Sequence, residues 1–202
     1  MQLNVARTLV RSSANGPGER FVVWVQGCPL ACRGCWNPDT WSFAQRTVVD
    51  IDTLTREILG TPNIDGVTFT GGEPFAQVAP LAELARRVRA HAMSVVAFTG
   101  YTLDELLSFD ARALLSQVDL LIAGRYDQTQ RAMLPGWRSS RNQTLHFLTN
   151  RFSELDVEET AVAEVHVEAD GKVVVTGFPE EGAASIAGGL RDDGRRTAGT
   201  LG

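Results

Sequence analysis

Short apolar runs and helical patterns alternate along the first 125 residues of the chain. The runs at residues 21–25, 66–70, 94–99 and 118–123 are rich in β-branched and aromatic residues, which is typical of buried strands. Between them, residues 50–59, 78–90 and 103–117 carry apolar side chains three and four positions apart, which predicts amphipathic helices. Strands that alternate with such helices form βαβ units. We therefore expect an α/β fold with mainly parallel strands, curved into an incomplete TIM-like β/α barrel.

The C-terminal part of the chain follows a different pattern. Residues 163–168 alternate at period two, Asp170 and Gly171 form a strong turn signal, and residues 172–176 return as a strand. We expect this hairpin to extend an edge of the sheet; the alternative is a docking element for a partner. Residues after Pro179 are rich in glycine and alanine, which predicts disorder. The predicted division is a core at 1–150, a hairpin extension at 151–179 and a tail at 180–202.

Composition limits the class of protein. The 202 residues are 44% hydrophobic and 21% charged, which is too apolar for a disordered chain and too polar for a membrane protein. No apolar run reaches the roughly 18 residues of a membrane helix, and the N-terminus lacks a signal-peptide stretch. We expect a cytoplasmic protein with no membrane partner. The net charge of -5 argues against a protein that binds nucleic acid through its phosphates.

All three cysteines, Cys28, Cys32 and Cys35, lie within eight residues. An odd number of clustered thiols is a poor disulfide framework, and in a reducing compartment it usually indicates metal binding. Structural zinc would need a fourth ligand, and the nearest histidine, His91, is far along the chain. A thioredoxin-type pair would use only the last two cysteines. Three thiolates on a four-iron cluster leave one iron open for a substrate or cofactor.

The segment from Asn15 to Trp41, NGPGERFVVWVQGCPLACRGCWNPDTW, carries a family resemblance. Its C-x3-C-x2-C spacing resembles the signature of the radical S-adenosylmethionine (SAM) enzymes. Its GPG-x-R, QGC and CWNPDTW flanks resemble the activating enzymes of glycyl radical enzymes. Gly34, just before the third cysteine, resembles in particular the small activases of anaerobic ribonucleotide reductases. The likeness covers residues 1 to about 150 and also implies the incomplete barrel.

The resemblance implies a reaction and its cofactors. It implies a [4Fe-4S] cluster held by Cys28, Cys32 and Cys35, with SAM on the open iron. An electron from a flavodoxin- or ferredoxin-type reductant would cleave SAM into methionine and a 5′-deoxyadenosyl radical. That radical would abstract a hydrogen atom from a glycine of a partner glycyl radical enzyme, such as anaerobic ribonucleotide reductase.

The resemblance also implies SAM contacts in the loops that follow the strands. GGEP at residues 71–74 resembles the motif whose backbone meets the methionine amino group, although a GG pair after a strand is also common turn chemistry. Thr102 with Glu105 has capping-box spacing. The implied cofactor-binding residues are Gly34, Trp36, Asn37, Gly71, Gly72, Glu73, Pro74, Thr99 and Arg125. Arg125 would meet the SAM carboxylate or lie at a surface turn.

Other functions stay open. Ala123 replaces an acid that the activases carry, and Ser139 to Gln143 only partly resembles their GSsNQ stretch. The Ala123 replacement and the added hairpin suggest an alternative function, a radical SAM enzyme that modifies a peptide or a small metabolite. An iron–sulfur or zinc module without catalysis is the alternative of another class.

Overall fold

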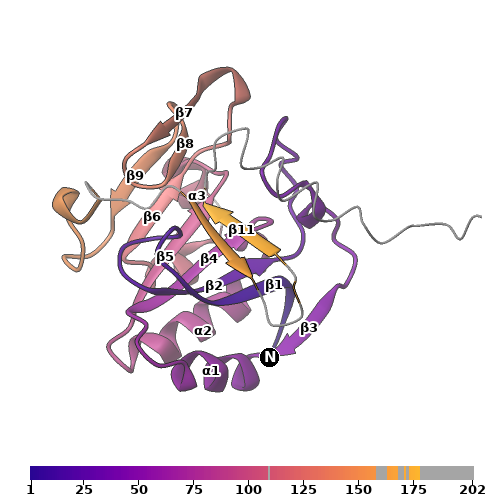
Figure 1. The fold of residues 1–202 in the computed structure, drawn as a ribbon, viewed down its shortest axis with the longest axis vertical. Coiled ribbons are helices and arrows are strands. Elements are labelled where there is room, and N and C mark those ends of the chain that lie inside the picture. The colour runs from indigo at the N-terminus through magenta and orange to yellow at the C-terminus, as the bar shows by residue number, and fades with distance from the viewer. Residues whose placement is uncertain (109, 158–162, 168–170, 172, 178–202) are drawn as a thin grey trace, which may run out of the picture.

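A seven-stranded sheet forms the centre of the fold in a computed structural model that describes residues 1–108, 110–157, 163–167, 171 and 173–177 (Figure 1). The strand order is β3-β1-β2-β4-β5-β6-β9. The four central strands run parallel and match the four expected runs: β2 (Arg20–Val25), β4 (Gly66–Gly71), β5 (Ser94–Thr99) and β6 (Leu120–Ala123). The prediction of an α/β fold with a mainly parallel central sheet is confirmed.

Three further strands join this sheet in antiparallel pairs that the hydrophobic pattern does not predict. β1 (Gln2–Ser12) pairs with β2, β3 (Thr47–Asp50) pairs with β1, and β9 (Thr144–Phe147) pairs with β6. The register of β1 against β2 shifts twice along the strand. Each shift moves side chains to the other face, so β1 shows no regular alternation in the sequence.

Helices α1 (Ile51–Gly60) and α2 (Val78–Arg89) lie where the periodicity places them. Asp50 caps α1, because its carboxylate accepts a 2.8 Å hydrogen bond from the Asp52 amide. The prediction of a single helix at 103–117 is wrong, because the structure has two shorter helices there, α3 (Leu103–Ser108) and α4 (Arg112–Leu115). The Ser108 hydroxyl donates to a carbonyl of its own helix, and such a bond competes with the helical ladder where α3 ends.

The two faces of the central sheet have different surroundings, because successive side chains of a strand point to opposite sides. Phe69 of β4 and Leu121 of β6 lie in the buried core that α1 and α2 complete. Trp24 of β2, Thr70 of β4 and Phe98 of β5 line a cavity instead. The helices thus cover one face of the sheet, and the other face is hollowed.

Arg20 ties the loop before β2 to the central strands. Its guanidinium is fully buried and donates to the Thr68 hydroxyl at 3.3 Å and to the carbonyls of Val67 and Ser94 at 2.7 and 2.9 Å. Burial lowers the pKa of Arg20 to about 9. The Thr68 hydroxyl in turn donates a 2.7 Å bond to the Asn15 carbonyl. The loop that carries Asn15 is therefore fixed against β4.

The predicted C-terminal hairpin is present as β10 (Ala163–Val167) and β11 (Val173–Gly177), an antiparallel pair. It forms a sheet of its own, so the expectation that it extends an edge of the central sheet is wrong. Gly171 of the expected turn has a φ of +83°, which glycine adopts readily, whereas Asp170 lies outside the described residues. The predicted tail at 180–202 lies outside them too.

The remaining elements are short. A second small sheet consists of β7 (Arg131–Leu134) and β8 (Arg138–Ser140). The 3-10 helices span Pro38–Thr40, Pro74–Gln77, Gln128–Gln130 and Glu154–Val157. Within the described part of the chain, every helix is too short or too polar to cross a membrane.

Candidate functional site

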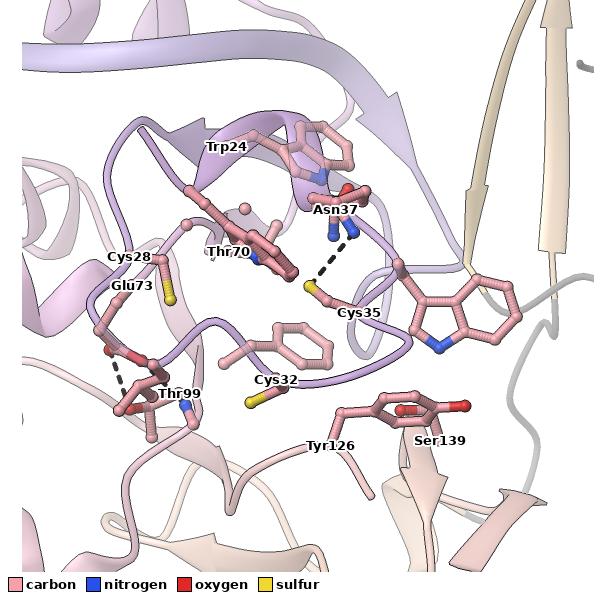
Figure 2. A pocket seen from close by; sticks show the side chains of 18 of the residues that line it. Trp24, Cys28, Cys32, Cys35, Asn37, Thr70, Glu73, Thr99, Tyr126 and Ser139 are labelled. Atoms are coloured by element: carbon pink, nitrogen blue, oxygen red, sulfur yellow. Dashed lines mark hydrogen bonds between the residues drawn. The ribbon is translucent and has the colours of Figure 1, made fainter. Parts of the chain in front are cut away.

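A cavity of about 440 Å³ opens at the C-terminal ends of the parallel strands (Figure 2). The loops that follow β2, β4, β5 and β6 all contribute to its lining, as do residues of the hairpin. Its volume is in the range of small-molecule and cofactor sites. Functional groups of α/β folds are found at this end of the strands, so the cavity is the candidate site.

The three cysteines line this cavity, and all three are half-buried free thiols. Figure 2 shows their sulfur atoms facing the same space. The Cys35 amide donates a 3.1 Å bond to the Cys32 carbonyl, which closes a tight turn between them. Gly34 in this turn has a φ of +76°, and a side chain there would also meet Gln128. Burial raises the pKa of the Cys28 and Cys32 thiols.

Hydrogen bonds to the cysteine loop hold it beside the GGEP loop. The Gly27 and Cys28 amides donate to the Thr40 and Trp41 carbonyls at 2.8 and 3.0 Å. The Glu73 amide donates a 2.8 Å bond to the Gly27 carbonyl. The two loops that the resemblance assigned to cluster and cofactor are therefore directly bonded to each other.

Glu73 is buried, and its carboxylate joins the GGEP loop to the end of β5. It accepts hydrogen bonds of 2.9 Å from the Phe75 amide, the Thr99 hydroxyl and the Gly100 amide. Burial raises the pKa of Glu73 to about 7, although these three donors favour the ionised form. Pro74 opens the 3-10 turn that leads into α2, as expected for a proline after this strand.

Most of the residues predicted to bind cofactor are brought together. Besides the three cysteines, those that line the cavity are Trp36, Asn37, Gly71, Gly72, Glu73 and Thr99. Gly34, Pro74 and Arg125 are not among its lining residues. Arg125 donates to both carboxylate oxygens of Glu105 at 2.9 Å, so the structure places its side chain at a surface ion pair. The expected cap is confirmed, because Glu105 and Thr102 exchange hydrogen bonds.

Other lining residues were not predicted: Arg7, Asn15, Trp24, Thr70, Tyr126, Val175 and Thr176. Trp24 lies on a strand that is buried along its whole length, so no alternation marks its face. Thr70 could have been predicted, because it is a polar residue near the end of a strand and directly precedes two glycines. Ser139 and Gln143, noted for their partial resemblance, also line the cavity. Ala123 is fully buried in the core on the helix side, so its difference from the activases lies outside the cavity.

The donor set fits a polynuclear cluster. Among the residues that the structure describes, no three histidine, cysteine or acidic side chains lie close enough to hold a single metal ion. The thiolates of a four-iron cluster bind separate irons and so need not converge on one point. Three half-buried thiols around a shared cavity, which also has room beside them, meet that requirement.

Comparisons with known proteins agree with this chemistry. A family model described as a 4Fe-4S single cluster domain matches residues 14–146. The anaerobic ribonucleoside-triphosphate reductase-activating protein of Haemophilus influenzae is 35% identical over 141 residues, which cover 65% of this chain and 90% of that protein. The protein of the same name from Escherichia coli (strain K12) is 31% identical over 142 residues, or 66% of this chain and 92% of that protein. The one from Enterobacteria phage T4 is 31% identical over 153 residues, or 71% and 93%.

A solved structure, that of QueE from Escherichia coli, aligns with a TM-score of 0.43 at 20% identity, covering 50% of this chain and 54% of that chain.

Proposed function

Because the chain belongs to the family of anaerobic ribonucleoside-triphosphate reductase-activating proteins, we propose that it is a radical SAM enzyme that generates a glycyl radical on a partner reductase. When bound, a [4Fe-4S] cluster supplies the electron that cleaves SAM into methionine and a 5′-deoxyadenosyl radical, which takes a hydrogen atom from the partner's glycine. The observation that carries the proposal is that three half-buried cysteines line one cavity at the C-terminal ends of the parallel strands.

Cys28, Cys32 and Cys35 are the proposed cluster ligands. The Asn37 amide lies 3.4 Å from Cys35 Sγ and donates to it. A hydrogen bond to a ligating sulfur stabilises negative charge on the cluster, and such bonds are among the factors that set its reduction potential. Asn37 therefore has a role toward the cluster as well as toward the cofactor.

The proposed SAM contacts are Gly34, Trp36, Asn37, Gly71, Gly72, Glu73, Pro74, Thr99 and Arg125. Gly71 and Gly72 present bare backbone to the cavity, so a ligand can approach it closely. The side chain of Glu73 is occupied by its three internal donors, so we expect the ligand to contact the backbone of this loop and not the Glu73 carboxylate. Pro74 acts by opening the turn. The contact of Arg125 stays a prediction, and it requires the guanidinium to leave Glu105.

Aromatic side chains form part of the lining, among them Trp24, Trp36, Phe98 and Tyr126. The rings help to exclude water from the cavity, and their ring C–H bonds are too strong for easy hydrogen abstraction. A reactive organic radical needs this protection. No side chain has to act as a general acid or base, because the reaction transfers a hydrogen atom.

We also propose that the curved sheet is an incomplete β/α barrel in a cytoplasmic protein. Parallel strands with helices on one face and a cavity at their C-terminal ends support the barrel, since TIM barrels keep their sites at this end. Three free thiols support the location, because the cytosol keeps thiols reduced.

The test is anaerobic reconstitution with iron and sulfide, followed by SAM, a flavodoxin- or ferredoxin-type reductant and the candidate reductase. We expect 5′-deoxyadenosine and a glycyl signal in electron paramagnetic resonance. Cys28→Ser, Cys32→Ser and Cys35→Ser should each lose cluster and both products. Cleavage of SAM without a glycyl signal would contradict the proposed partner reductase and favour a peptide or metabolite substrate. A protein that takes up only zinc, or that never cleaves SAM, would overturn the enzyme itself.

A further inference from the structure

The hairpin β10–β11 reaches the candidate site although it lies beyond residue 146, where the family match ends. Val175, Thr176 and Gly177 of β11 line the cavity together with the cysteines. Figure 1 shows the hairpin, in orange, lying across the region of β1 and β2. The predicted extension at 151–179 therefore contributes to the site that the core forms.

Glu164 attaches β10 to the end of β1 and the loop that follows it. Its carboxylate accepts hydrogen bonds from the Ser12 hydroxyl at 2.5 Å, the Ser13 hydroxyl at 2.6 Å and the Ser13 amide at 2.8 Å. Burial alone would raise the pKa of Glu164, but these bonds outweigh it and lower the pKa to about 2. The carboxylate is therefore ionised at neutral pH and binds its donors as a charged acceptor.

A second attachment joins β11 to the same loop. The Asn15 side-chain amide donates to the Thr176 hydroxyl at 2.7 Å and to the Ser12 hydroxyl at 2.8 Å. Asn15 is itself held by Thr68, which Arg20 contacts. The hairpin is thus anchored, through buried hydrogen bonds, to the central strands.

The pattern along β10 is the reverse of that in an ordinary half-buried strand. Glu164 and His166 face the protein, whereas Val165 and Val167 are 63% and 71% exposed. On this strand, attachment therefore depends on polar bonds to Ser12 and Ser13 more than on apolar burial. A substitution at Glu164 can release the strand without changing the core.

We propose that the hairpin is an additional wall of the SAM site and that Glu164 is the positioning residue that holds this wall in place. The inference rests on the proposed function for the identity of the ligand. Thr176 offers a hydroxyl and Val175 an apolar surface to that ligand. With the wall attached, one side of the cavity is closed to solvent, and bound SAM leaves more slowly.

The experiment compares Glu164→Gln with wild type and with Val165→Thr in the full chain. Glutamine keeps the size of the side chain but removes its charge and one acceptor. Val165 lies next to it and faces solvent, so Val165→Thr is the matched control. Two measurements are made on anaerobically reconstituted protein: equilibrium dialysis of SAM, and hydrogen exchange of the backbone amides in residues 163–177. Iron content is recorded for each sample.

For Glu164→Gln we expect faster exchange in the hairpin, a dissociation constant for SAM raised about tenfold, equivalent to about 1.4 kcal/mol, and unchanged iron content. Val165→Thr should match wild type in all three. Faster exchange with unchanged SAM affinity would contradict the proposal that the hairpin is a wall of the SAM site. Unchanged exchange would overturn the role of Glu164. Wild-type protein that holds its iron but binds no SAM would instead contradict the proposed function, and the exchange data would still decide the role of Glu164.

Discussion

Arg7 Nη2 donates a 2.6 Å hydrogen bond to Asn37 Oδ1, which connects strand β1 to the segment after the third cysteine. The same guanidinium lies over the Trp24 ring, with Cζ 4.8 Å from the ring centroid. Asn37 also donates its backbone amide to Cys35 Sγ. Arg7 of β1 thus holds Asn37 in place, and Asn37 in turn bonds to a proposed cluster ligand.

We predict that Arg7→Met weakens the hold on the cluster. Methionine keeps an apolar stem over Trp24 but cannot donate to Asn37, and a hydrogen bond of a charged donor contributes about 1.5–3 kcal/mol. The expected result is a several-fold faster loss of the iron–sulfur absorbance when reconstituted protein is treated with a chelator. Arg11→Met is the control, because Arg11 lies on the same strand and donates to the Pro62 carbonyl instead. Equal rates for the two variants would show that the Arg7 contact has no such role.

The second prediction concerns the close approach of the GGEP loop and the cysteine loop. A Cβ at Gly72 would lie 2.4 Å from the Gly27 carbonyl oxygen, a backbone atom that cannot move without shifting the cysteine loop. Gly72→Ala should lower the free energy of unfolding of the cluster-free protein by about 1–3 kcal/mol, as overpacking does. Its SAM affinity after reconstitution should fall as well.

Gly60 at the end of α1 provides the matched control. A Cβ there meets no atom within 4 Å. Gly60→Ala should raise the free energy of unfolding by about 0.4–1 kcal/mol, because alanine restricts the unfolded chain. Urea denaturation measures both variants. A Gly72→Ala protein as stable as Gly60→Ala would mean that the two loops are not packed as described.

The sequence was sufficient for the parts of the fold that repeat a simple pattern. The four parallel strands and α1 and α2 follow from apolar runs and helical periodicity, and the cysteine spacing indicated the cluster site. β1 was missed because its register shifts break the alternation. Because β1 is not predicted, Arg7 is not predicted to belong to the site. Nothing in the local sequence relates Arg7 to Asn37.

Long-range contacts explain the other differences. The alternation at 163–168 predicts a strand, but it does not show that the polar face turns inward, because Ser12 and Ser13 are far away in the sequence. The family resemblance implies either a cofactor contact or a surface turn for Arg125, and its ion pair with Glu105 depends on where α3 lies. Pattern and spacing identify elements and loops, whereas partners of charged side chains follow from packing.

The last prediction is a pH dependence that arises from Glu73. Burial raises the pKa of Glu73 in the folded protein to about 7, whereas an unfolded chain has a glutamate pKa of about 4.3. The folded state therefore binds this proton more tightly. Its stabilising contribution is complete below about pH 4.3 and is lost as the pH rises through 7. Between pH 5 and 8, the free energy of unfolding of cluster-free protein should fall by roughly 2–3 kcal/mol from this group.

Glu73→Gln should abolish that slope, because the amide does not titrate. Urea denaturation at pH 5, 6, 7 and 8 measures it. Glu83→Gln is the control: the hydrogen bonds of Arg86 and Arg87 lower the pKa of Glu83 to about 2, so this carboxylate stays ionised across the range and the slope should match wild type. Burial raises the pKa of the Cys28 and Cys32 thiols from about 9, so these groups titrate above the measured pH range. A slope that persists in Glu73→Gln would place the titrating group elsewhere, and the carboxylate would then be ionised at neutral pH and held by its three donors.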